Sequence, residues 1–161
     1  MNEQIIDEIK AYHEAGHAVV AHCLPFDVGR ITIDEENGVL AHANFRPKDG
    51  RRPEARYWVR CYLAGLTAVA IHTGSPDKWN SFRDKNDMQK CYEICGRLGF
   101  KATEADSFIE QEQKETRRLL SEERNWNIVE ALASALLTDR TLSLDEANSI
   151  LRGEAGGWPL S

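Results

Sequence analysis

Apolar residues recur three or four positions apart along most of the chain, which is the spacing of an amphipathic helix. In the first segment Ile5, Ile6 and Ile9 form an inward face, and Leu24 with Pro25 ends the pattern. The same reasoning predicts helices over residues 1–23, 54–73, 86–99, 103–123, 126–137 and 143–151. The last of these starts with a capping box, Ser-x-x-Glu, at residues 143–146.

The helix predicted from residue 86 begins at Asn86, a residue type that favours the N-cap position. Asp87 is therefore expected in its first turn, after a polar loop over residues 75–85. A carboxylate there is stabilised by the unpaired backbone amides and by the positive end of the helix dipole, so it stays ionised and available to a cation. The alternative is that Asp87 only completes the cap.

Two short runs, residues 29–34 and 38–45, read as extended strands. They are joined through Asn37 and Gly38, a pair that favours a tight turn. The expected fold is therefore mainly α, a helical bundle with one small β-hairpin. The length of 161 residues fits one domain, residues 1–153, followed by a loose C-terminal tail, residues 154–161.

Charge and composition exclude several classes of function. With 20 basic and 26 acidic residues the net charge is −6, and the basic residues cluster only as two arginine pairs, which disfavours a nucleic-acid partner. No glycine-rich phosphate loop is present, so ATP hydrolysis is not expected. The chain has neither an apolar run of membrane-spanning length nor a leader pattern, which predicts a cytoplasmic protein without membrane insertion.

The cysteines lie in apolar helical segments, as reduced thiols of a cytosolic core do. Cys91 and Cys95 are one helical turn apart, but such pairs are usually core positions, and a second metal site there is disfavoured. The remaining cysteines are Cys23 and Cys61.

The candidate chemistry lies in the first helix, at His13-Glu14-Ala15-Gly16-His17. Residues four apart stand one turn above each other on a helix, so the imidazoles of His13 and His17 can face one metal ion. Glu14 lies beside them and can take a proton from a metal-bound water, which is the arrangement of a zinc hydrolase. A shuffled chain of this composition would show His-acid-x-x-His about 0.02 times.

The alternative is a metal-free scaffold in which two partly buried histidines pair with other polar groups. The residues around the motif are small and apolar, as on a buried helix, and a buried helix needs a reason to carry two histidines and a glutamate. A metal ion supplies that reason.

A catalytic zinc site needs a third protein ligand. One common extension places a histidine six residues after the second histidine of the motif, but that position is Cys23, and His22 is one residue early. The other extension uses a distant carboxylate on a second helix. By sequence alone the candidates are Glu54, Asp77, Asp84, Asp87 and Glu93.

The motif segment, residues 11–25, resembles the peptidase domain of the FtsH family, the membrane-anchored, ATP-dependent zinc proteases. Residues 28–45 resemble the hairpin of that family, residues 63–68 its Leu-x-Gly-Arg-Ala-Ala helix, and Asn86-Asp87-Met88 its Asn-Asp-Leu segment. The C-terminal helices are similar as well, so the resemblance covers nearly the whole chain.

The resemblance implies that Asp87 is the third zinc ligand and Glu14 the general base. It also implies that the edge strand binds the substrate backbone, through Leu40, Ala41, His42, Ala43 and Asn44. A purely structural hairpin is the alternative for this segment. The chain departs from the family in the missing AAA+ motor and membrane helices, in Val69-Ala70 where the family has two glutamates, and in a longer loop over residues 75–85.

We therefore expect a free-standing zinc metalloendopeptidase that binds one Zn²⁺ per chain and hydrolyses a peptide or unfolded protein by a zinc-activated water. The alternative is a zinc-binding interaction module with little protease activity that docks on a separate AAA+ protein or another partner. Candidates for stabilising the tetrahedral oxyanion besides zinc are His42 and Tyr12. The pattern does not fix the oligomeric state.

Overall fold

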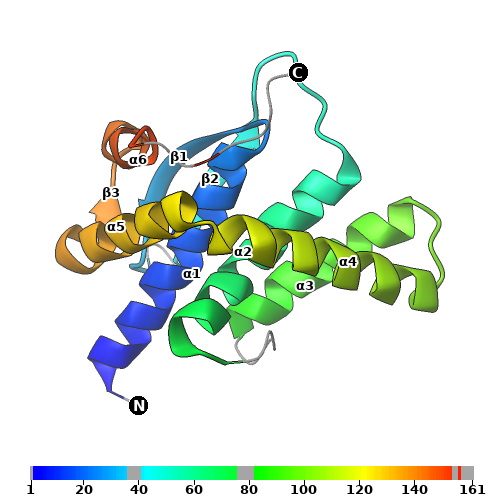
Figure 1. Cartoon of the computed structure of the whole chain (residues 1–161), viewed down its shortest axis with the longest axis horizontal. Helices are drawn as coiled ribbons and strands as arrows, with labels where there is room; N and C mark the ends of the chain where they lie inside the picture. The colour runs from blue at the N-terminus through cyan, green and yellow to red at the C-terminus, as the bar shows by residue number, and fades with distance from the viewer. Residues whose placement is uncertain (1, 36–40, 76–81, 154–155, 157–161) are drawn as a thin grey trace.

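The computed structural model describes residues 2–35, 41–75, 82–153 and 156. Within these residues, six helices and three short strands confirm a mainly α fold (Figure 1). The elements in chain order are α1 (Glu3–Cys23), β1 (Phe26–Thr32), β2 (His42–Pro47), α2 (Ala55–Thr73), α3 (Phe82–Arg97), α4 (Ala102–Ser121), α5 (Glu123–Asp139), β3 (Thr141–Leu142) and α6 (Leu144–Leu151).

The strands form one antiparallel sheet in the order β2-β1-β3, so β2 lies at an edge. The predicted hairpin is present as β1 and β2, with Val28 opposite Phe45 and an irregularity in the register between Val28 and Ile31. The predicted turn at Asn37 and Gly38 lies outside the described residues. Strand β3 was not predicted, because a two-residue strand carries no periodicity and pairs with β1 only through the tertiary fold.

Helix α1 is the central element of the molecule. Figure 1 shows it between α2 and α5, with the sheet beside its carboxyl-terminal half. A close approach to α2 is possible because position 16 is glycine: a Cβ atom there would lie 2.5 Å from the carbonyl oxygen of Ala64 and 2.5 Å from the Cβ of Ala68. Small residues on both helices therefore set the distance between them.

Two hydrophobic clusters surround this helix pair. One joins α1 to the sheet, α5 and α6, and the other joins α2 to α3 and α4. All four cysteines are buried and none forms a disulfide, as expected for core thiols. Cys91 and Cys95 pack in the second cluster.

The predicted start of α3 was wrong. The helix begins at Phe82, so Asn86 is not its N-cap. Asp87 lies in the second turn of the helix rather than in the first. The inward face of the helix, marked by Met88, Cys91 and Cys95, continues one turn back to Asp84, which is only 8% exposed. A pattern search for apolar residues passes over a buried aspartate, and the polar composition of the segment then suggests a loop.

The C-terminal helix confirms the capping box. The Ser143 hydroxyl oxygen accepts a hydrogen bond from the Glu146 amide, and the Glu146 carboxylate accepts one from the Ser143 amide, each at 3.1 Å. Of the predicted tail, residues 154–161, only Gly156 is described, and its carbonyl oxygen lies 2.6 Å from the Cys23 thiol. Among the described helices, none is both long enough and apolar enough to cross a membrane.

Candidate metal centre

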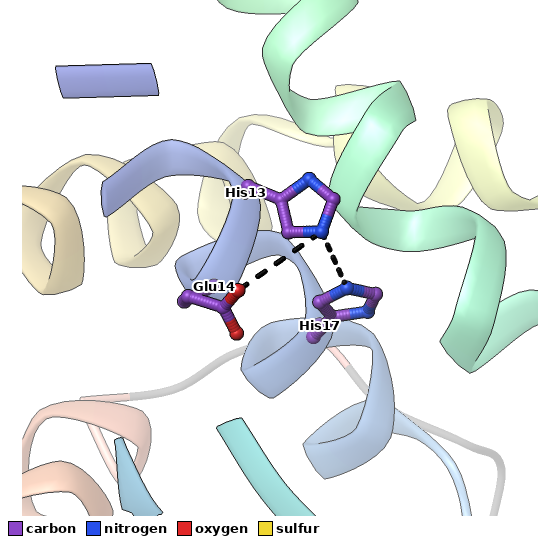
Figure 2. Close-up of side chains that lie close together, drawn as sticks. All are labelled: His13, Glu14 and His17. Atoms are coloured by element: carbon purple, nitrogen blue, oxygen red, sulfur yellow. Dashed lines mark hydrogen bonds and ion pairs between the residues drawn. The ribbon is translucent and has the colours of Figure 1, made fainter. Parts of the chain in front are cut away.

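Helix α1 presents the three motif side chains together, as the spacing predicted. His13, Glu14 and His17 are 3%, 2% and 6% exposed. Figure 2 shows the two imidazoles converging, with the Glu14 carboxylate beside them. The Nε2 atoms of His13 and His17 are 3.0 Å apart, and a Glu14 oxygen lies 4.0 Å from Nε2 of His13. Within the described residues these three form a group that can hold a metal ion.

Asp87 brings a third donor to the same point from α3. Its Oδ2 atom lies 3.1 Å from Nε2 of His13 and 3.1 Å from Nε2 of His17. The three donor atoms thus form a nearly equilateral triangle with sides of 3.0–3.1 Å. Tetrahedral zinc with ordinary Zn–N and Zn–O bonds separates its ligand atoms by about 3.3 Å. The three atoms would therefore fit as ligands of one zinc ion.

The outer ring nitrogens indicate which atoms face the centre of this triangle. Nδ1 of His17 lies 2.7 Å from the carbonyl oxygen of Cys61, and a carbonyl can only accept, so this nitrogen carries a proton. Nδ1 of His13 lies 3.4 Å from Oδ1 of Asp84. Both contacts favour the tautomer that leaves an Nε2 lone pair for a metal, as the outer contacts of zinc-binding histidines usually do. Two lone pairs and a carboxylate oxygen at this distance require a proton or a metal ion between them.

The electrostatics of the cluster show what competes with a metal. Burial lowers the pKa of His13, but hydrogen bonds to Asp84 and Asp87 raise it more, to about 10. For His17 the same opposition of burial and Asp87 gives a raised pKa. Burial raises the pKa of Asp87, but the two histidines lower it well below its usual range. Without a metal ion, the raised pKa of His13 favours a proton on this cluster at neutral pH.

Helix α2 contacts the two imidazoles at Gly65, a position that leaves no room for a side chain. A Cβ atom at Gly65 would lie 2.5 Å from Nε2 of His17 and 2.6 Å from Nε2 of His13. No ordinary side chain fits there while the two imidazoles keep these positions. Gly65 therefore lets α2 pack directly against the inner nitrogens of His13 and His17.

The three donor residues line a cleft of about 270 Å³, together with Glu14 and the edge strand β2. Of the residues predicted to bind the substrate backbone, Ala41, His42 and Ala43 line this cleft. Asn44 instead faces Gly29 on β1, and Leu40 lies outside the described residues. Strand β2 pairs with β1 on one side, and in the sheet of described residues it has no strand on the other.

Of the other candidate ligands that the structure describes, none reaches the triangle. Glu54 and Glu93 are exposed and contact Arg56 and Gln89 respectively. Asp77 lies outside the described residues. Asp84 is close, but it contacts the outer nitrogen of His13 and not the inner one.

Of the two oxyanion candidates, only His42 lines the cleft. The Tyr12 ring stacks on His72 with ring centroids 3.6 Å apart, and it is not part of the cleft lining.

Three polar residues of the cleft were not predicted as site residues: Tyr62, Asn86 and Lys90. On α3, Asn86 directly precedes Asp87 and Lys90 follows it by about one turn. Helical spacing could therefore have indicated both residues once Asp87 was taken as a metal ligand. No signal in the sequence indicated Tyr62. It directly follows Cys61, whose carbonyl oxygen contacts Nδ1 of His17 in the folded chain.

No protein-family model matches the chain, and a search of curated proteins finds no similar protein. The assignment of function therefore depends on the motifs and on the geometry of the site.

Proposed function

We propose that the chain is a zinc-dependent metalloendopeptidase, related to the peptidase domain of the FtsH family. The observation that supports it best is the triangle of His13, His17 and Asp87, with sides of 3.0–3.1 Å, on the wall of a cleft that also contains Glu14. The three donors are the residue types that a catalytic zinc site uses, and the site is reached through the cleft.

A bound zinc ion supplies a Lewis acid that lowers the pKa of water to about 7 and polarises a carbonyl group. The residues of the chain supply the rest. Glu14 is buried beside His13, where its carboxylate can accept the proton of the attacking water and pass it to the leaving amine. The open side of β2 can pair with an extended peptide. Such pairing would bind the peptide through main-chain hydrogen bonds, largely independent of its sequence.

The direct test compares the parent chain with Glu14→Gln, both purified without a histidine tag. We expect one zinc per chain in both proteins, measured by elemental analysis. The parent should cleave casein and lose this activity with a chelator. The Glu14→Gln chain should cleave at least about a hundredfold more slowly, because it lacks the general base.

Equal cleavage rates for the two proteins would contradict the role of Glu14. A chain that binds zinc but cleaves no protein would instead support the interaction module. Absence of zinc from both proteins would contradict the metal centre itself.

A further inference from the structure

The metal cleft contains hydrogen-bond donors besides its histidines. Among the described residues that line it, the side chains of Tyr62, Asn86 and Lys90 can donate. Attack of water on a peptide carbonyl places negative charge on the carbonyl oxygen, and a fixed donor aimed at that oxygen lowers the barrier. A donor for this task must lie beside the metal ligands and must have no other hydrogen-bond partner.

Tyr62 lies on the helix that packs against the two imidazoles. The carbonyl oxygen of the preceding residue, Cys61, lies 2.7 Å from Nδ1 of His17. Three residues after Tyr62, a Cβ atom at Gly65 would lie 2.5 Å from Nε2 of the same histidine. Residues three apart share one face of a helix, so Tyr62 lies on the side of α2 that faces the imidazoles.

The Tyr62 ring is fixed by its neighbours. Its centroid lies 5.7 Å from that of Phe45 and 6.3 Å from that of Trp58, and the Lys90 ammonium lies 5.1 Å from it. These contacts come from three elements, β2, α2 and α3, and together they hold the ring in one orientation. The contact with the ring also gives the Lys90 ammonium a partner.

The Tyr62 hydroxyl, in contrast, has no hydrogen-bond partner within the described part of the chain. A tyrosine hydroxyl that is shielded from water usually has one, and Tyr62 is half-buried. Burial raises the pKa of Tyr62, and Cys61 and Asp87 raise it further, so the hydroxyl keeps its proton at neutral pH. It is therefore available to donate to a group bound in the cleft.

We propose that Tyr62 is a further catalytic residue, whose hydroxyl donates a hydrogen bond to the carbonyl oxygen of the bond being cleaved. This rests on the proposed function. As water adds to the carbonyl carbon, the carbonyl oxygen becomes negative, and the hydroxyl stabilises this charge while it keeps its own proton. The hydrogen bond weakens again when the carbon–nitrogen bond breaks and the carbonyl re-forms. Glu14 carries the transferred proton, so the two residues have separate tasks.

The test removes one hydroxyl and leaves the ring. Tyr57→Phe is the matched control for Tyr62→Phe, because Tyr57 lies on the same helix and is not part of the cleft lining. With zinc bound, kcat and KM are measured on a fluorogenic casein peptide. In Tyr62→Phe we expect kcat to fall about a hundredfold with KM changed by less than about threefold, because the donor acts in the transition state. Zinc content and melting temperature should equal those of the parent.

A second measurement needs no cleavage. The probe is a phosphinic peptide, in which a tetrahedral phosphorus with two oxygens replaces the amide that would be cleaved. Its Kd is measured by isothermal titration calorimetry with zinc present. Tyr62→Phe should bind it at least about tenfold more weakly than the parent, because a charged oxygen loses its donor. Tyr57→Phe should bind it as the parent does.

The outcomes separate this proposal from the proposed function. Unchanged kcat or unchanged affinity for the phosphinic peptide in Tyr62→Phe would overturn the role of Tyr62 and leave the peptidase. Loss of zinc in that variant would also overturn it, because the hydroxyl would then support the metal centre rather than the reaction. A parent chain that cleaves nothing, but binds the phosphinic peptide through the Tyr62 hydroxyl, would keep the contact and remove the peptidase.

Discussion

Each of the two motif histidines is held at both ring nitrogens. His17 contacts the Cys61 carbonyl oxygen on its outer side, and His13 contacts Asp84, while their inner nitrogens and Asp87 form the triangle. Asp84 and Asp87 are three residues apart on α3, so one helix face contacts both sides of the same imidazole. Asp84 is thus placed to orient His13, a proposed zinc ligand, from the side away from the triangle.

Replacing Asp84 should weaken zinc binding. Because an outer contact fixes the tautomer and orientation of a ligand, Asp84→Ala should cost about 10–100-fold in zinc affinity. Asp84→Asn keeps an oxygen acceptor and should lose less. Competition with a chelating dye measures the affinities, and Asp106→Ala, at an aspartate that accepts from Tyr92, is the control. Unchanged affinity in Asp84→Ala would remove the orienting role.

Zinc affinity should depend steeply on pH. Burial lowers the pKa of His13, but Asp84 and Asp87 raise it to about 10, so at neutral pH a metal ion must displace a proton. We expect the affinity to rise about tenfold per pH unit between pH 6 and 8 for each proton released. Isothermal titration in buffers of different ionisation enthalpy measures the released protons. An affinity independent of pH would contradict this competition.

The raised pKa of His13 also makes the folding stability of the zinc-free chain depend on pH, and this stability falls as the pH rises. A group whose pKa rises from 6.5 to about 10 on folding stabilises the fold fully below pH 6.5, and this stabilisation is lost as the pH rises toward 10. The contribution of His13 should therefore make chelated protein melt at a lower temperature at pH 9 than at pH 6.5, as measured by thermal denaturation at the two pH values. Zinc should offset this loss, because it replaces the proton.

At the scale of the elements, the packing of α1 against α2 determines the site. Gly16 allows contact with Ala64 and Ala68, and Gly65 allows α2 to reach the two imidazoles. The glycine inside the motif thus serves the helix packing rather than the chemistry. The two helices could not approach this closely with larger residues at these positions.

Gly65→Ala should damage the metal centre more than the fold. The new methyl group would lie within 2.6 Å of His13 and His17 atoms, so the rings must move, and we expect at least about a tenfold loss of zinc affinity. The control is Gly96→Ala on α3, where a Cβ meets nothing within 4 Å. That change should raise the unfolding free energy by about 0.5–1 kcal/mol. Zinc titration and chemical denaturation measure the two effects, and equal zinc affinity in both variants would contradict the crowding argument.

At the scale of the whole molecule, the metal donors join segments far apart in the chain. Asp87 follows His13 by 74 positions and comes from a different helix. A metal ion that binds only when α1 and α3 are packed together stabilises the folded state against the unfolded chain.

Zinc should accordingly raise the melting temperature. At a free zinc concentration a hundred times Kd, the added stability is about 2.7 kcal/mol. For a chain of this size that is a rise in Tm of about 5–10 °C. Differential scanning calorimetry with and without a chelator measures it. His17→Ala removes one donor and should abolish the zinc-dependent part, so a rise of the same size in that variant would place the zinc elsewhere.

The sequence by itself determined the local features. Helical spacing put His13, Glu14 and His17 on one stretch of α1, and the Ser143–Glu146 capping box fixed the start of α6, because both depend on residues within one turn. The apolar pattern also gave the mainly α class.

Only the tertiary structure decided which features meet. It brought Asp87, and no other described candidate, to the inner nitrogens of the two imidazoles. It also showed Asp84 as a buried part of α3 and joined β3 to the sheet. It also showed the close approach of Gly65 to the two imidazoles. The reason is physical: these contacts depend on the packing of helices that are distant in sequence, and residue spacing carries no information about which faces will touch.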